Sequence, residues 1–142
     1  MARVVWRNGD LNDLASRVKA IPEQFLDQAS EAIDEATQTG AAQMRSYIEN
    51  RGTGYDGHTG RVDEGYMLGD VAASEVENNG RSARGEYGWG VTGGPVQPYY
   101  IYQENGFKHW RSGKDVPPMH ALLDSFIETR EKFFARIARM VK

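Results

Sequence analysis

Apolar residues spaced three and four positions apart in the N-terminal third limit the possible folds more than any other feature of the chain. This spacing predicts one helix over 22–50, with Pro22 at its first position and Gly52 after its end. At about 1.5 Å per residue the helix is about 43 Å long, whereas a compact domain of 142 residues is about 37 Å across. It must therefore lie across the surface of the domain. The apolar positions are Leu14, Val18, Ile21, Phe25, Ala29, Ala32, Ile33, Ala36, Met44 and Tyr47.

The segment Thr37-Gln38-Thr39-Gly40 is the weak point of this helix, because it combines poor helix formers with a glycine. It predicts either a kink or a close crossing under another helix. Ahead of the long helix, Asp10 is a suitable N-cap for a short helix over 11–20, and residues 3–7 suit a short strand or an extended arm.

The middle of the chain has the pattern of an antiparallel sheet. Two segments, 71–78 and 82–91, flank Asn79-Gly80, which is a strong signal for a β-hairpin. In the second segment Tyr87, Trp89 and Val91 alternate with small or polar residues. One face of this strand is therefore aromatic. The other face carries Gly88 and Gly90, which predicts a group packed close to the backbone.

A second amphipathic helix is predicted over 118–141, where Pro117-Pro118 mark its start. Arg130 falls near the middle of its apolar face. An arginine in that position either extends its head group to water or pairs with a buried carboxylate, for which Glu104 is the candidate. The apolar face is formed by Met119, Leu122, Leu123, Phe126, Phe133, Ile137 and Val141.

These segments predict one α+β domain over 1–142, with a long N-terminal amphipathic helix, a small antiparallel sheet and a C-terminal helix packed on the sheet. Its parts in chain order are 3–7 (strand or arm), 10–51 (helices), 52–60 (flexible loop), 61–104 (sheet region), 105–117 (long loop) and 118–141 (C-terminal helix).

Composition narrows the functional classes. A net charge of −3 and a pI of about 5.6 argue against a dedicated nucleic-acid-binding protein. The absence of cysteine excludes disulfides and thiol chemistry. No apolar run approaches the roughly 20 residues of a membrane span, and the N-terminus does not resemble a signal peptide. We therefore expect a soluble protein that is used without export and does not bind membranes.

The sequence carries no recognised catalytic, metal or cofactor motif. The three histidines His58, His109 and His120 do not have the spacing of a zinc site. Residues 88–93 match GxGxxG but do not open a helix, so we expect neither a nucleotide nor another cofactor. An acid–base pair of Glu104 with His109 or His120 remains an alternative, although a capping or surface carboxylate is the commoner role for such a residue.

Charged residues form two stripes. The acidic stripe on the first long helix is not neutralised within that helix, since no base occurs between residues 20 and 44. The stripes can complement the helix dipoles, meet oppositely charged surfaces of neighbouring copies, or, in the acidic case, line a channel that repels a polyanion. The acidic stripe comprises Glu23, Asp27, Glu31, Asp34 and Glu35, and the basic stripe comprises Lys132, Arg136, Arg139 and Lys142.

Residues 97–110, QPYYIYQENGFKHW, combine aromatic rings with one acid and one glycine. We expect the alternating tyrosine and isoleucine side chains to pack beneath the two helices, with one or two rings left at the subunit edge. We expect Glu104 to fix a corner through hydrogen bonds or through Arg130 or Arg61. Apolar side chains on the following loop predict a covering partner. A single-strand nucleic-acid site, with Lys108, Arg111 and Lys114 around the rings, is an alternative. The candidate interface residues are Tyr99, Tyr102, Glu104, Phe107, Lys108, Trp110 and Arg130.

The order of these segments resembles the tail-component, tail-completion or head–tail joining proteins of long-tailed double-stranded DNA phages. In that family an amphipathic helix is followed by a Thr-Gly-Arg/Leu step, a tyrosine-rich segment ending in an acid and a glycine, and a proline-led C-terminal helix. The corresponding residues here are 59–62 (TGRV), 99–106 (YYIYQENG) and 116–119 (VPPM). Phe107 and the long loop with Trp110 depart from the family pattern.

This resemblance implies a structural virion protein and not an enzyme. Members of the family form rings, typically of six subunits, at the neck or the head-proximal end of the tail. The implied partners are other copies of the chain, the adjacent connector or stopper ring, the tail tube or tail terminator protein, and double-stranded DNA that passes through the lumen without sequence recognition. The implied location is the virion, and the host cytoplasm during assembly. A tail terminator ring is the nearest alternative.

Overall fold

The computed structural model describes residues 3–7, 23–53, 60–62, 65–94 and 96–140. The predicted helix over 11–20, most of the predicted loop over 52–60, and Lys142 lie outside these residues. The elements in chain order are β1 (Arg3–Arg7), α2 (Glu23–Asn50), α3 (Tyr66–Gly69), β2 (Val71–Ala73), β3 (Glu77–Asn78), β4 (Ala83–Trp89), α4 (Pro98–Asn105), β5 (Phe107–Lys108), β6 (Asp115–Val116) and α5 (Ala121–Met140).

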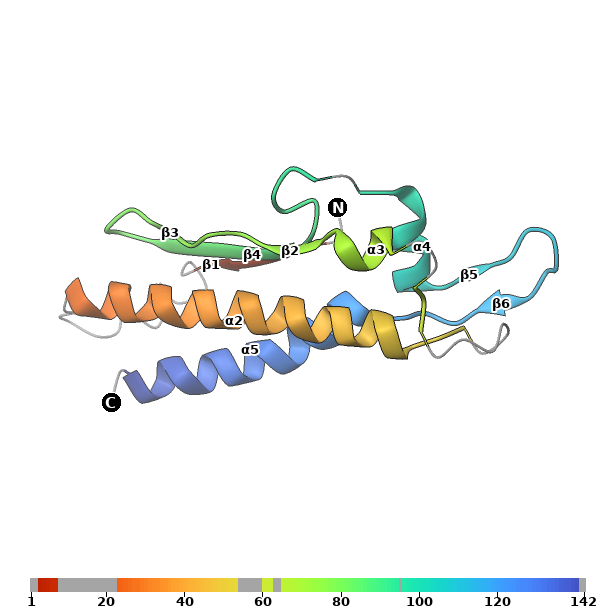
Figure 1. The fold of residues 1–142 in the computed structure, drawn as a ribbon. Coiled ribbons are helices and arrows are strands. Elements are labelled where there is room, and N and C mark those ends of the chain that lie inside the picture. Colours follow the sequence, from red (N-terminus) through yellow and green to blue (C-terminus); the bar gives the residue numbers. More distant parts are fainter. Residues whose placement is uncertain (1–2, 8–22, 54–59, 63–64, 95, 141–142) are drawn as a thin grey trace.

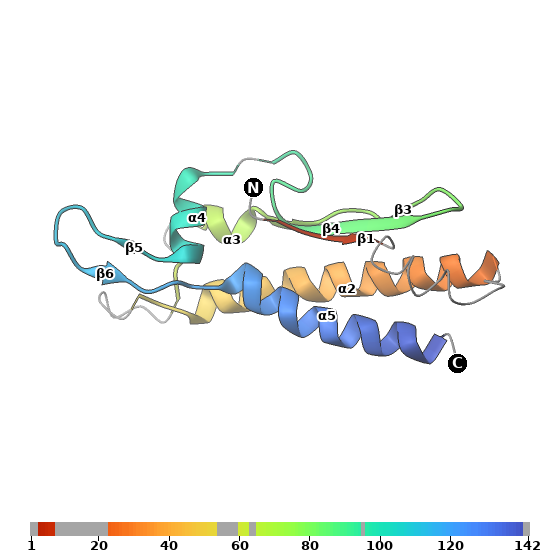
Figure 2. The same cartoon turned by 180° about the vertical axis from the view of Figure 1, so that it is seen from behind.

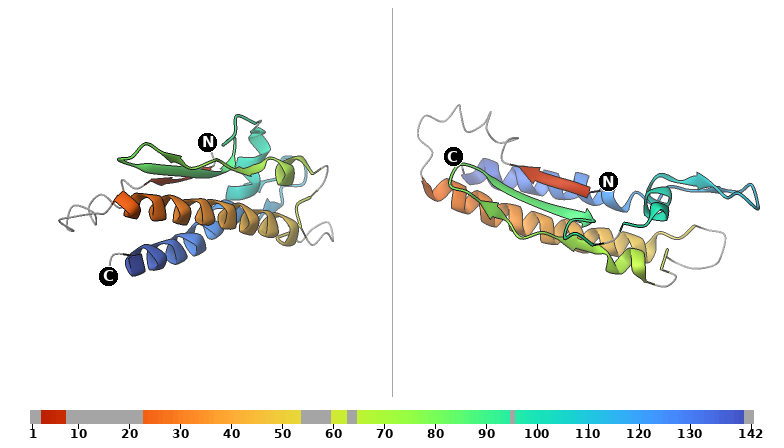
Figure 3. Two further views of the ribbon diagram at one scale, coloured as in Figure 1. Left: turned by 60° about the vertical axis from the view of Figure 1, so that its left-hand side comes forward. Right: turned by 90° about the horizontal axis from the view of Figure 1, so that it is seen from above.

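The fold is α+β, with one sheet lying over a pair of antiparallel helices (Figures 1 and 2). Strand β4 is central and pairs antiparallel with β1, β2 and β3. The view from above in Figure 3 shows β1 on the side of α5 and β2 and β3 on the side of α2. The long N-terminal helix, the small antiparallel sheet and the C-terminal helix packed on it are therefore confirmed.

The hairpin predicted at Asn79-Gly80 is confirmed. Asn78 pairs with Ala83, and the side-chain oxygen of Asn79 accepts hydrogen bonds from the backbone N–H groups of Arg81 (2.9 Å) and Ser82 (2.8 Å). Gly80 has a φ of +83°, a conformation that an asparagine-glycine turn readily supplies. Local turn chemistry is therefore sufficient to place this hairpin.

Helix α2 is continuous through Thr37–Gly40 and passes close beneath the sheet at Gly40. A Cβ atom added to Gly40 would lie 2.5 Å from Cε1 of Tyr87, and one added to Gly85 of β4 would lie 2.7 Å from Cγ2 of Ile33. Residues 37–40 therefore do not interrupt the helix, and the nearest neighbour of Gly40 is a strand residue, not a residue of the helix that the sequence led us to expect. The glycine allows a helix to approach a strand.

The aromatic face of β4 forms the centre of the core. The side chains of Tyr87, Trp89 and Tyr100 are fully buried. Each polar atom of these rings is satisfied, since Trp89 Nε1 donates to the carbonyl oxygen of Met67 (2.9 Å), Tyr87 shares a hydrogen bond with Ser125 (2.9 Å), and Tyr100 donates to Asp70. The glycines of the opposite face have a conformational role, because Gly88 and Gly90 have φ values of +129° and +77°.

Two predicted segments differ from the structure. Residues 98–104, predicted as the end of the sheet region, lie in helix α4 (Pro98–Asn105), and the predicted loop over 105–117 contains the β5–β6 hairpin. Tyrosine and isoleucine favour strands, but Pro98 suits the first turn of a helix, and Tyr100 and Glu104 are both buried at i, i+4 spacing. Packing of Tyr100 against Trp89, with ring centroids 5.2 Å apart, favours the helix.

We predict that replacing Gly40 with alanine destabilises the fold. In an exposed helix this change would stabilise by about 1 kcal/mol, but here the new methyl group clashes with a buried ring that is held by Ser125. We expect a loss of about 1–3 kcal/mol in the free energy of unfolding, measured by urea denaturation. Gly94→Ala is the control, since an added Cβ there meets no atom within 4 Å. Equal stability of the two variants would contradict the close crossing.

We also predict a loss of stability at alkaline pH. Burial raises the pKa of Tyr87, and burial together with the hydrogen bond to Asp70 raises the pKa of Tyr100. Tyrosines of the unfolded chain ionise near pH 10, whereas these two phenols stay protonated in the folded state at that pH. Their contribution to the free energy of unfolding is therefore complete below pH 10 and decreases as the pH rises further. Ultraviolet titration should show at least two tyrosines that ionise only on unfolding. Complete tyrosine ionisation in the folded protein near pH 10 would contradict this prediction.

Candidate interaction surface

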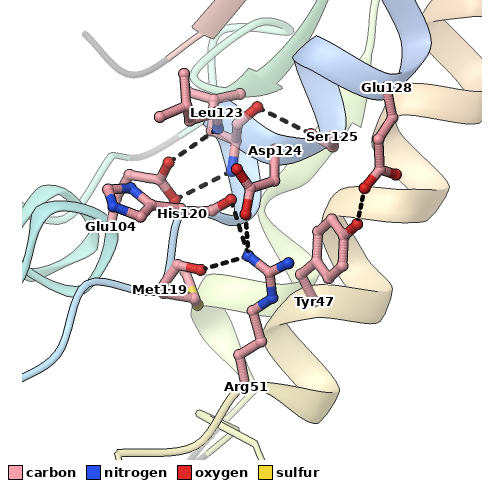
Figure 4. Close-up of polar contacts among 10 residues, drawn as sticks. Tyr47, Arg51, Glu104, Met119, His120, Leu123, Asp124, Ser125 and Glu128 are labelled. Atoms are coloured by element: carbon pink, nitrogen blue, oxygen red, sulfur yellow. Dashed lines mark hydrogen bonds and ion pairs between the residues drawn. The ribbon is translucent and has the colours of Figure 1, made fainter.

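Glu104 forms the corner between α4 and α5 and is only 6% exposed (Figure 4). Its two carboxylate oxygens accept hydrogen bonds from the backbone N–H groups of Leu122 and Leu123, both at 3.0 Å. These N–H groups belong to the first turn of α5, where helix geometry leaves donors unsatisfied and the helix dipole favours a negative charge. Glu104 therefore caps α5 from a different element, which agrees with the hydrogen-bonded corner expected from the sequence.

Of the two alternatives for Arg130, the exposed head group agrees with the structure, and the ion pair with Glu104 is wrong. The side chain of Arg130 is exposed on α5, and its guanidinium lies 5.5 Å from the ring centroid of Phe126. The physical reason is that the helix N-terminus already satisfies both oxygens of Glu104, while Arg130 can reach water and an aromatic face from its own helix.

Two arginines hold the same corner together. Arg51, at the end of α2, donates to the carbonyl oxygen of Met119 (2.9 Å) and pairs with Asp124 of α5. Arg61 donates to the carbonyl oxygens of Arg51 (2.9 Å), Gln103 (3.0 Å) and Pro117 (2.6 Å). The sequence indicated Arg61 only as a partner for Glu104. The sequence analysis did not identify Arg51 as a residue of this corner. Its position directly after a helix C-terminus, where a positive charge is favourable, is the one signal that could have identified it.

The β5–β6 hairpin projects beyond this corner at one end of the molecule (Figures 1 and 3). Phe107 pairs with Val116, and the turn is closed by a hydrogen bond from the backbone N–H of His109 to the carbonyl oxygen of Lys114 (2.8 Å). Trp110 at the turn is 81% exposed, and the guanidinium of Arg111 lies 4.5 Å from its ring centroid. The hairpin thus displays a cationic aromatic tip.

The outer face of α4 continues the exposed apolar surface. Tyr99, Ile101 and Tyr102 are 44%, 38% and 58% exposed, and the rings of Tyr102 and Phe107 are 6.2 Å apart. The expected burial is therefore confirmed for Tyr100 and wrong for Ile101, while the exposure of Tyr99 and Tyr102 agrees with the expectation that one or two rings remain at an edge. A helix turns successive residues by about 100°, so one short helix can bury Tyr100 and expose its neighbours.

The two charge stripes partly meet within the chain. Asp27, Glu31, Asp34 and Glu35 are exposed on α2, but Glu35 pairs with Arg136 of α5. Antiparallel packing of the helices creates this contact and relieves one acid that the sequence left unneutralised. Glu23 begins α2, but its side chain lies outside the described residues. A groove of about 350 Å³ between the helices is lined by Glu35, Thr39, Thr129, Lys132, Arg136 and Arg139, together with Ala32, Ala36 and Phe133.

Two groups of the alternative acid–base site, Glu104 and His109, make structural contacts. Both oxygens of Glu104 accept backbone hydrogen bonds, and Nδ1 of His109 lies 3.2 Å from the backbone nitrogen of Ser112 in the hairpin turn. Within the described ranges, no group of three or more histidine, aspartate or glutamate side chains is arranged to hold a metal ion. No helix in the described part of the chain is long and apolar enough to cross a membrane.

No family model, curated protein or solved structure matches this chain. The likeness to phage tail-completion proteins therefore depends on the order of the sequence segments. What the structure adds is their geometry: the tyrosine-rich segment is α4, the acid caps α5, and Gly106 has a φ of +80° between α4 and β5.

We predict that Glu104→Ala destabilises the protein by about 1–3 kcal/mol, because two donors in the first turn of α5 lose a buried partner. Urea denaturation measures this loss. Glu131→Ala is the control, since Glu131 is an exposed glutamate on α5, the helix that Glu104 caps. If both variants unfold at the same urea concentration, the carboxylate of Glu104 does not serve as a cap.

Proposed function

We propose that this chain is a structural virion protein of a long-tailed phage. It forms a ring at the neck or head-proximal end of the tail, which joins the head to the tail tube and lets DNA pass. The observation that carries this proposal is the projecting β5–β6 hairpin, whose Trp110 is 81% exposed and whose Phe107 ring lies 6.2 Å from that of the exposed Tyr102 of α4. A soluble chain has little reason to display such a surface unless another protein covers it.

The capped corner supports an assembly role over a catalytic one. Glu104, the residue that an acid–base mechanism would need, is buried and bound to α5 by both oxygens. The hairpin leaves this corner at Gly106, which has a φ of +80° and where an added Cβ would lie 2.9 Å from the carbonyl oxygen of Val116. A rigid base and an exposed tip are what a subunit needs to dock on a neighbour at a defined angle.

The proposed partners follow from the ring. Other copies of this chain lie beside it, a connector or stopper ring lies on the head side, and the tail tube or tail terminator protein lies on the tail side. Double-stranded DNA passes through the lumen without sequence recognition. The proposed location is the virion, with assembly in the host cytoplasm.

We predict that the double variant Phe107→Ser/Trp110→Ser folds but fails in head–tail joining. The test supplies wild-type or variant protein to a phage that lacks this chain, and counts complete virions against free heads and tails by electron microscopy. Wild-type protein should restore complete virions and be present at the neck or the head-proximal end of the tail. The variant should leave heads and tails separate, because the surface that meets another subunit is lost.

Phe134→Ser is the control, since Phe134 is also an exposed aromatic residue but lies on α5, away from the hairpin. It should support joining as well as the wild type. If the hairpin variant restores as many complete virions as the wild type, the hairpin is not the surface that joins head to tail. Wild-type protein that is missing from virions and does not form rings with connector and tail-tube proteins would refute the function itself.

A further inference from the structure

The hairpin and the first half of α2 carry opposite charges. Residues 107–116 contain three bases, Lys108, Arg111 and Lys114, and one acid, Asp115. Residues 23–44 contain five acids and no base. Lys108 lies 3.9 Å from Asp115, whereas Arg111 is at the turn, with its guanidinium 4.5 Å from the centroid of the exposed Trp110 ring.

Among the residues that the structure describes, not every acid of α2 has a basic partner. Glu35 pairs with Arg136, and Asp27 accepts a hydrogen bond from Asn78 (3.2 Å). No basic side chain in the described part of the molecule forms an ion pair with Glu31 or Asp34, and both are exposed. These two carboxylates form an acidic ridge on the outer side of α2, which we call the Glu31/Asp34 ridge.

The tip and the ridge lie at opposite ends of the molecule (Figures 1 and 3). The hairpin projects past the C-terminal end of α2, whereas the ridge is in the N-terminal half of that helix. From Asp34 to Asn50 the helix axis runs about 24 Å, since each residue adds about 1.5 Å. One chain therefore cannot bring its own tip onto its own ridge.

We propose, building on the ring suggested above, that the Trp110/Arg111 tip of one copy docks on the Glu31/Asp34 ridge of the next copy. The contact is heterologous, because two different surfaces meet. Repetition of a heterologous contact closes into a ring when its rotation allows and otherwise extends into a filament. Opposite charges at the two ends favour this head-to-tail order, because tip against tip and ridge against ridge place like charges together.

Charge reversal tests the contact. Arg111→Glu and the double variant Glu31→Arg/Asp34→Arg should each lower the association constant of the chain about tenfold or more, measured by sedimentation velocity at low salt. Combining all three changes in one chain should restore association, because every contact then joins a glutamate at the tip to arginines on the ridge. Mixing the tip variant with the ridge variant should also restore association, because every contact between unlike copies then joins opposite charges: an arginine tip on an acidic ridge, or a glutamate tip on an arginine ridge.

Glu49→Arg is the matched control, because Glu49 is an exposed acid on α2 in the half away from the ridge. It should associate like the wild type, and all variants should keep the wild-type thermal unfolding midpoint, since the changed residues are exposed. Association that is unchanged by Arg111→Glu overturns this docking while the ring proposal stands. A wild-type chain that remains monomeric, alone and with neck and tail proteins, overturns both. Loss of salt-sensitive DNA binding without loss of self-association assigns the tip to DNA instead.

Discussion

Tyr87 connects the three layers of this protein, and it can do so only because residue 40 has no side chain. Its ring occupies the space where a Cβ of Gly40 would lie, and its hydroxyl group reaches Ser125 of α5 at 2.9 Å. The strand, the long helix and the C-terminal helix therefore meet at one fully buried residue. Close packing at this point sets the spacing of the sheet above both helices, and the remaining core forms around it.

The corner at the other end of the core depends on a buried charge. Glu104 is stabilised by the first turn of α5, and Arg51 ties the end of α2 to the same turn. Three helices are thereby joined where the hairpin begins. The exposed tip with Trp110 needs this anchor, because a short two-stranded hairpin is only marginally stable by itself. A buried carboxylate thus anchors the elements from which the exposed hairpin projects.

Sequence patterns predicted the fold well where the signal is local. The helical repeat placed α2, the alternation and the Asn79-Gly80 turn placed the β3–β4 hairpin, and the prolines preceded α5. The patterns failed over 98–116, where strand-forming residues lie in a helix and a glycine-containing loop forms a second hairpin. Both outcomes depend on contacts with distant residues, such as Trp89 for Tyr100 and Val116 for Phe107.

The sequence by itself determined the class of fold, the two amphipathic helices and the central hairpin. It also drew attention to Glu104 as a corner residue and to the aromatic segment around it. Periodicity and turn chemistry are properties of neighbouring residues, so they can be read without coordinates. Only the tertiary structure decided which groups meet: Glu104 with the start of α5, Glu35 with Arg136, and Gly40 with Tyr87. It also decided which aromatic rings remain exposed. The contact partner of a side chain and its exposure to solvent both depend on how helices and strands pack. That packing is determined jointly by residues that are far apart in the sequence.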